Sequence, residues 1–152
     1  MRPPRIHGFD YRGSYPYSLT FSTFRRRRYF EDVSVVSIVL REILRTATEH
    51  GFDVLAYCFM PDHLHLLVEG RSPDARLLSF AKSCRQRTTV AVRRPDGALL
   101  WQRGYHERTL GSDDRVDIVA KYIEGNPVRA GLVQTVDEWP HTGGLLLRSW
   151  MP

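Results

Sequence analysis

The sequence predicts an α+β fold, a ferredoxin-like β-α-β-β-α-β antiparallel sheet followed by an additional C-terminal helix. Four short segments with alternating or continuous apolar residues indicate strands. Three longer segments with apolar residues every three or four positions indicate helices. Because these segments follow one another in the split βαβ order, both early helices should cover one face of the sheet. The other face then stays open for a ligand or for the third helix.

The first strand and the first helix come from the clearest periodicities. Apolar and polar side chains alternate over residues 17–23, as they do in a half-buried strand. A run of four arginines follows. Apolar side chains over residues 35–47 fall on one helical stripe, and Gly51 is expected to end that helix.

Two further strands are expected at residues 54–59 and 64–68. The connection Met60-Pro61-Asp62 between them is short. Proline suits such a connection because it fixes φ and has no N–H to donate to a strand ladder. The two segments are therefore expected to form a hairpin.

The second half of the chain contains two helices and one strand. A helix with one apolar and one basic side is expected to begin near Pro73. The last strand is expected at residues 99–110, interrupted at Gly104. An apolar stripe over residues 116–123 predicts the additional helix, which Pro127 should break or restart.

Length and composition indicate one globular domain. The chain has 152 residues, a common size for a single core, so we expect residues 1–152 to form one domain with tails at residues 1–14 and 143–152. The formal charge is +5, which is compatible with a nucleic-acid partner but does not require one. The two cysteines, Cys58 and Cys84, are isolated and fit a reducing compartment. With neither a secretory signal nor a long apolar run, we expect a cytoplasmic protein without membrane contact.

His63 and His65 form the first candidate site. Side chains alternate across a strand, so both imidazoles should lie on the face opposite Leu64 and Leu66. Two residues along a strand span roughly 7 Å, and metal–imidazole bonds are about 2 Å long, so the pair can share one ion. Alternatively, the histidines pack against an aromatic ring or bond a carbonyl. Asp62 either supports a histidine as an acceptor or caps the turn.

Tyr122 and Asn126 form the second candidate site. At about 100° per residue, Tyr122 falls off the apolar stripe of its helix, and Asn126 lies on the same flank four residues later. Both side chains would then project towards one site. Alternatively, Tyr122 is a boundary residue with an exposed hydroxyl, and Asn126 caps a helix whose first residue is Pro127.

These segments together resemble the HUH transposases, in particular the REP-associated tyrosine transposases and related small single-tyrosine transposases. The resemblance is carried by residues 57–68 (YCFMPDHLHLLV) and residues 122–133 (YIEGNPVRAGLV). Residues 100–107 are similar to the family's penultimate strand region, and residues 139–142 are similar to its tail. The matches extend from about residue 17 to residue 142 in the family's order.

The resemblance implies a metal-dependent enzyme acting on single-stranded DNA beside a hairpin, often a repeated palindrome. It implies that His63 and His65 bind the metal, that Asn126 is the third ligand, and that Tyr122 is the nucleophile. Three nitrogen and oxygen ligands with open positions suit Mg²⁺ or Mn²⁺. Attack by the tyrosine would give a 5′-phosphotyrosine and a free 3′-OH. No small-molecule cofactor is implied, and a homodimer that exchanges the tyrosine helix is possible.

Basic residues outside these motifs are candidates for phosphate contacts. They are Arg25, Arg26, Arg27, Arg28, Arg76, Lys82, Arg85, Arg87 and Arg129. Two other functions remain open: a domesticated nucleic-acid-binding protein without catalysis, and an HUH replication initiator or relaxase. The short chain and the Asn-Pro-Val-Arg string disfavour the initiator. The histidines and the tyrosine occurring together disfavour simple binding.

Overall fold

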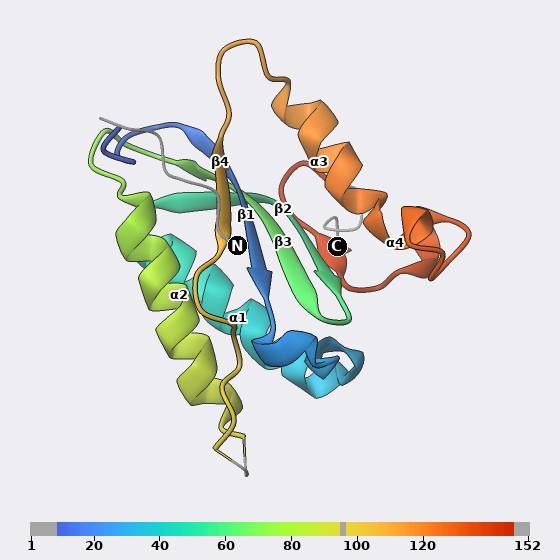
Figure 1. Cartoon of the computed structure of the whole chain (residues 1–152). Helices are drawn as coiled ribbons and strands as arrows, with labels where there is room; N and C mark the ends of the chain where they lie inside the picture. Colours follow the sequence, from blue (N-terminus) through green and yellow to red (C-terminus); the bar gives the residue numbers. More distant parts are fainter. Residues whose placement is uncertain (1–8, 95–96, 148–152) are drawn as a thin grey trace.

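The computed structural model describes residues 9–94 and 97–147, which form a five-stranded antiparallel sheet with helices on both faces (Figure 1). The strands are β1 (Pro16–Ser22), β2 (Phe52–Met60), β3 (His63–Gly70), β4 (His106–Thr109) and β5 (Thr142–Gly143). The helices are α1 (Val33–His50), α2 (Leu77–Val92), α3 (Val116–Glu124) and α4 (Asn126–Arg129), with short 3-10 turns at Phe24–Arg26, Tyr29–Glu31 and Val136–Glu138. None of the helices in the described ranges is long and apolar enough to span a bilayer.

The strand order is β4-β1-β3-β2-β5, and every neighbouring pair is antiparallel. The first four strands therefore have the ferredoxin-like arrangement that the sequence predicts, with β5 added at the β2 edge. In the β2–β3 hairpin, Met60 pairs with His63, which leaves only Pro61 and Asp62 in the turn. Such a short turn fixes the register of β3 from its first residue.

The first helix starts with a side-chain cap, and it ends at Gly51, where the sequence predicts. The Asp32 carboxylate accepts a hydrogen bond from the Ser34 N–H over 2.9 Å and caps the first turn of α1. Gly51 ends α1 in the left-handed region with φ 75°, which glycine adopts without steric cost.

Alternation along β3 assigns its side chains to two different cores. Leu64 and Leu66 pack with the residues of α1 and α2, whereas Leu67 packs with Ala120 and Ile123 of α3. Because side chains two residues apart share a face, His63 and His65 lie on the same face as Leu67. The histidine pair is therefore on the side of the sheet that carries α3, and α1 and α2 cover the other side (Figure 1).

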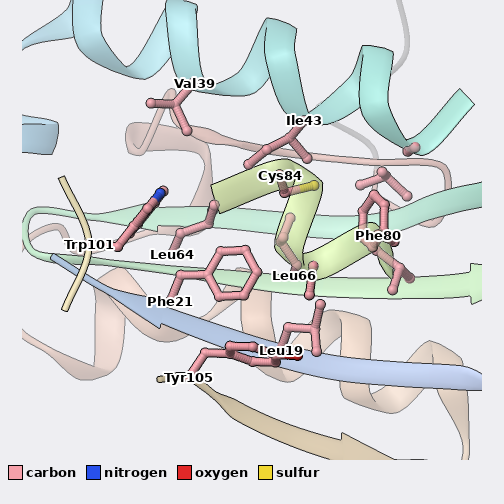
Figure 2. Close-up of a cluster of buried hydrophobic side chains, with 14 of the residues drawn as sticks. Leu19, Phe21, Val39, Ile43, Leu64, Leu66, Phe80, Cys84, Trp101 and Tyr105 are labelled. Atoms are coloured by element: carbon pink, nitrogen blue, oxygen red, sulfur yellow. The ribbon is translucent and has the colours of Figure 1, made fainter. Parts of the chain in front are cut away.

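The core under α1 and α2 is rich in aromatic side chains (Figure 2). Trp101 packs edge-on to Phe21 and donates from Nε1 to the buried Thr88 hydroxyl over 2.8 Å. Tyr17, Trp101 and Tyr105 are buried and belong to this core. Tyr15 is 46% exposed.

The expected strand at residues 99–110 is mostly irregular. Only His106–Thr109 pairs with β1, and Trp101 forms an isolated bridge with Thr23. Gly104, at φ 77°, turns the chain between these two contacts, so an extended strand cannot continue through it.

Parts of both expected tails pack onto the domain. The Tyr11 side chain is 3% exposed, and the Gly13 N–H donates to the Ala75 carbonyl over 2.8 Å. At the other end, Gly143 pairs with β2, and Leu147 joins the core beneath α3. The rest of those tails, residues 1–8 and 148–152, lies outside the described residues.

Candidate metal and nucleophile site

The two histidines of β3 lie next to each other on the α3 side of the sheet. The centroids of their imidazole rings are 4.8 Å apart, and the ring planes are inclined by 83°. Strand alternation and the tight β2–β3 turn produce this arrangement, since His63 is the first residue of β3 and His65 is the third. The geometry leaves both rings close enough to share one ion.

An Arg26–Asp62 ion pair holds the ring of His63. Asp62 Oδ1 lies 2.7 Å from His63 Nδ1, and Arg26 Nε donates to Asp62 Oδ2 over 3.0 Å. Burial raises the pKa of the Asp62 carboxyl, but its hydrogen bonds with Arg26 and His63 outweigh burial and hold that pKa below its usual value. Because the carboxylate contacts Nδ1 of His63, Nε2 is left as the nitrogen for an external ligand.

The backbone that delivers Arg26 is strained. Arg25 and Arg26 both adopt left-handed conformations with φ 54°. Such residues cost roughly 1–3 kcal/mol each and persist where surrounding contacts hold them. The Arg26–Asp62 contact is one such restraint, which favours a role for this segment in shaping the histidine site.

A threonine of β1 holds the ring of His65. Thr20 pairs with His65 across the strands, and Thr20 Oγ1 lies 3.3 Å from His65 Nδ1. Burial, the neighbouring His63 and the charge of Arg129 lower the pKa of His65 to about 4. His65 is therefore neutral near pH 7, which is the form of imidazole that binds metals.

The β2 neighbour of His65 is a buried thiol. Cys58 pairs with His65 on one side and with Thr142 of β5 on the other. Burial raises the pKa of the Cys58 thiol to about 11, so it stays protonated and is a poor metal ligand. In the described ranges, no three His, Cys, Asp or Glu side chains gather to hold a metal.

Tyr122 and Asn126 lie along the same flank of α3 and α4. Ala120 and Ile123 anchor α3 against its own chain's sheet, while the Tyr122 side chain is 63% exposed. Asn126 is the first residue of α4, preceded by Gly125. The alternative that Asn126 caps this helix is wrong, because its amide oxygen accepts from Arg129 rather than from a backbone N–H of the first turn.

Arg129 connects these two residues. Its guanidinium carbon lies 3.7 Å from the centroid of the Tyr122 ring, and its Nη2 donates to Asn126 Oδ1 over 2.6 Å. The same nitrogen also donates to the Tyr122 carbonyl oxygen. After burial and the neighbouring His63, the Arg129 charge also contributes to the lowered pKa of His65.

The nine basic residues expected to contact phosphates are in several different environments. Arg25, Arg26, Arg27 and Arg28 follow β1 and are exposed; Arg26 contacts Asp62 and His63, and Arg28 pairs with Glu31 over 3.1 Å. Arg76 precedes α2, and Lys82, Arg85 and Arg87 lie on it, against the sheet face opposite the histidines. Arg85 donates to the Gln102 carbonyl and Arg87 pairs with Glu49, so both are held within the fold. A cavity of about 880 Å³ adjoins α2, away from the histidines.

Thr20 is a site residue that the sequence reasoning missed. The signal was present, because alternation over residues 17–23 places Ser18, Thr20 and Ser22 opposite the buried Tyr17 and Leu19. A polar row on a strand next to two histidines indicates the lining of a site.

Comparison with known proteins gives one family and several relatives. A family model described as "Transposase IS200 like" matches residues 12–126. The chain is 31% identical over 121 residues to the ISDra2 transposase TnpA of Deinococcus radiodurans, covering 72% of this chain and 85% of the relative. It is 28% identical over 110 residues to a protein of Haemophilus influenzae named as a REP-associated tyrosine transposase, covering 64% of this chain. The matched region spans 62% of that second relative's length.

Two solved structures share the fold. The structure of a REP-associated tyrosine transposase bound to a REP hairpin superposes with a TM-score of 0.76 at 19% identity, covering 92% of this chain and 82% of the other. The crystal structure of a Deinococcus radiodurans R1 protein assigned as a transposase gives a TM-score of 0.56 at 24% identity, covering 81% of this chain and 97% of the other.

Proposed function

Because the chain belongs to the IS200-like transposase family, we propose that it nicks and rejoins single-stranded DNA through a covalent 5′-phosphotyrosine intermediate. The observation that carries the proposal is the oriented histidine pair. Both rings are held through Nδ1, one by Asp62 and the other by Thr20. Binding of DNA alone requires no such arrangement, whereas a metal-assisted phosphoryl transfer does.

His63, His65 and Asn126 are the residues that would hold a divalent ion, Mg²⁺ or Mn²⁺. The donor set fits, because both imidazoles keep Nε2 available and the Asn126 amide oxygen has a lone pair beyond the one that Arg129 occupies. A bound ion would polarise the scissile phosphate and offset the charge that develops on it. The Asn126 amide oxygen and the oxygens of a bound phosphate are hard donors of the kind that these two ions prefer, whereas the two imidazoles alone would not select them.

Tyr122 is the proposed nucleophile. Its hydroxyl oxygen would attack phosphorus while the bond from phosphorus to the 3′ oxygen breaks. The phenol loses its proton, the departing 3′ oxygen gains one, and the 5′ end remains on the tyrosine. One phosphodiester replaces another, so attack by a new 3′-OH can reverse the reaction and join strands. The exposure of Tyr122 is suited to meeting a large substrate.

The proposed DNA partner is a hairpin with an adjoining single strand. Support comes from the relative whose structure holds a REP hairpin and from the family membership of this chain. The exposed arginines beside His63 offer charge for the phosphates next to the site. The hairpin sequence is for experiment to identify.

A covalent-capture assay tests this function. The protein is incubated with Mn²⁺ and labelled single strands carrying hairpins from around its own gene, and adducts that survive denaturation are counted. Wild type should form an adduct and Tyr122→Phe should form none. Tyr15→Phe should match wild type, because Tyr15 precedes β1 at the end of that strand away from His63. An adduct with Tyr122→Phe would refute the nucleophile. Hairpin binding without any adduct in wild type would favour the non-catalytic binding protein instead.

A further inference from the structure

At the junction between α3 and α4, an arginine of α4 folds back over α3. Arg129 follows Tyr122 by seven residues, yet its guanidinium stacks on the Tyr122 ring at 3.7 Å. Both hydrogens of Nη2 are used, because Nη2 donates to the Tyr122 carbonyl and to Asn126 Oδ1. One side chain therefore contacts the ring of the proposed nucleophile and the ligating atom of the proposed third ligand.

A glycine makes room for this arrangement. A Cβ built on Gly125 would lie 2.7 Å from Arg129 Nη1, closer than real contacts allow. The backbone of Gly125 is ordinary, with φ −78° and ψ −4°, so conformation does not require glycine there. The space beside Gly125 is instead filled by the Arg129 guanidinium, the end of a flexible side chain, so a Cβ at position 125 would displace the guanidinium and not the backbone.

We propose that Arg129 is a positioning residue that holds Tyr122 and Asn126 in one fixed relationship, with Gly125 admitting its guanidinium. This inference rests on the proposed function. Attack on phosphorus requires the tyrosine oxygen and the proposed metal ligands to be correctly placed relative to each other. A misplacement of about 1 Å can slow an enzymatic step by about a hundredfold. Tyr122 is largely exposed, so few other contacts hold its ring, and the stacked guanidinium restricts the ring on one side.

A direct role for Arg129 in gripping phosphate is the competing explanation. Nη2 is committed to one acceptor on α3 and one on α4, and one flat face of the guanidinium is covered by the Tyr122 ring. A phosphate clamp instead needs the planar fork free for bidentate contact. The internal contacts therefore favour positioning over clamping.

Gly125→Ala is the sharpest test, because it displaces the guanidinium without removing its charge. Alanine is favoured over glycine in helical conformations, so the thermal midpoint should stay constant or rise. The rate of adduct formation should fall by about tenfold or more. Gly111→Ala is the matched control, since its Cβ would lie 3.8 Å from the nearest atom, an ordinary contact. A Gly125→Ala protein that forms adducts at the wild-type rate overturns the inference.

Arg129→Lys separates positioning from phosphate binding. Lysine keeps the charge but cannot bridge two acceptors with one planar group. The affinity for Mn²⁺ should fall by up to about tenfold. It is measured without DNA, from the electron paramagnetic resonance signal of free Mn²⁺. The double variant Asn126→Ala, Arg129→Lys should bind Mn²⁺ as weakly as Asn126→Ala alone, because Arg129 acts on the metal site only by holding Asn126. Arg115→Lys, whose arginine pairs with Asp117 on the same helix, is the control.

The outcomes distinguish this inference from the proposed function. Absence of an adduct with wild type refutes the function and removes the basis of the inference. An adduct with wild type, together with unchanged Mn²⁺ affinity in Arg129→Lys but weakened hairpin binding without metal, refutes positioning and supports a phosphate clamp. Loss of adduct rate and Mn²⁺ affinity with unchanged hairpin binding supports positioning.

Discussion

Asp62 Oδ1 lies 2.7 Å from His63 Nδ1, so two residues adjacent in sequence also meet through their side chains. The carboxylate orients the ring and leaves Nε2 outward. Asp62→Ala should therefore lower the affinity for Mn²⁺ by about 10- to 100-fold. The measurement is a Mn²⁺ titration followed by electron paramagnetic resonance. Asp53→Ala, which removes an ion pair with Arg71 at the other end of β2, should leave the affinity unchanged.

Thr20 should affect Mn²⁺ affinity because it orients the ring of His65. Thr20→Val keeps the shape of the side chain but removes the oxygen that lies 3.3 Å from His65 Nδ1. We expect Mn²⁺ affinity to fall by about tenfold, in the lower part of the range for partners of metal ligands. Ser18→Ala, two residues earlier on the same face of β1, is the control. Equal affinities of Thr20→Val and wild type would contradict the orienting role.

Two basic residues on different sides of the sheet should differ in their effect on hairpin binding. Arg25 precedes Arg26 beside the histidine site, whereas Lys82 lies on α2 against the opposite face. Arg25→Ala should weaken binding and reduce the slope of log affinity against log salt by about one. Lys82→Ala should leave the slope unchanged. A slope change at Lys82 as large as at Arg25 would mean that DNA reaches the helical face.

The Thr88–Trp101 hydrogen bond should stabilise the core. Thr88→Val leaves the buried Trp101 N–H without its acceptor, which costs about 1–3 kcal/mol of unfolding free energy. Thermal denaturation should give a Tm lower by about 2–4 °C for each kcal/mol. Thr89→Val removes only a hydroxyl that donates to the Arg85 carbonyl, so its Tm should change much less. Equal Tm values for the two variants would be evidence against the hydrogen bond.

The cap of α1 should contribute stability that depends on pH. Hydrogen bonds from the side chain and backbone of Ser34 hold the pKa of Asp32 below its usual value. The unfolded chain then binds this proton more readily than the native protein. The stabilisation is therefore present above a pH of about 4 and is lost as pH falls through the lower native value.

Asp32→Ala tests this directly. Its Tm should be lower than that of wild type at pH 7, by about 2–4 °C, and the difference should shrink as the pH approaches about 2. Asp113→Ala, in the exposed loop before α3, should lower the Tm little at either pH. A difference for Asp32→Ala that persists at the lowest pH would show that the carboxylate charge is not responsible.

Local periodicity was sufficient to predict that His63 and His65 lie on one face of the sheet. Two histidines separated by one apolar residue on a strand must share a face, and the register of β3 confirms this. The flank shared by Tyr122 and Asn126 also follows from helical spacing, and the Arg129 contacts bear it out. The roles of these residues came from family resemblance, because spacing alone does not distinguish a nucleophile from a boundary tyrosine.

The remaining features depend on tertiary contacts that no local pattern carries. The left-handed backbone of Arg26 is unfavourable for an isolated residue, and its contact with Asp62 joins two distant loops. Residues 99–110 have apolar side chains suited to a strand, yet Trp101 is buried in the core, where it donates a hydrogen bond to Thr88. Both outcomes were decided by partners far away in sequence.

The β2–β5 pairing has a consequence for how the protein is made. Thr142 contacts Cys58 across 84 residues, so the outer edge of β2 stays open until most of the chain has left the ribosome. An open edge is a template for pairing with another chain, and long-range pairings form slowly. Gly143 allows β5 to approach Tyr57 of β2 closely, because a Cβ at position 143 would lie 2.6 Å from the Tyr57 hydroxyl. A truncation before Thr142 would therefore leave this edge of β2 open and increase aggregation of newly made molecules.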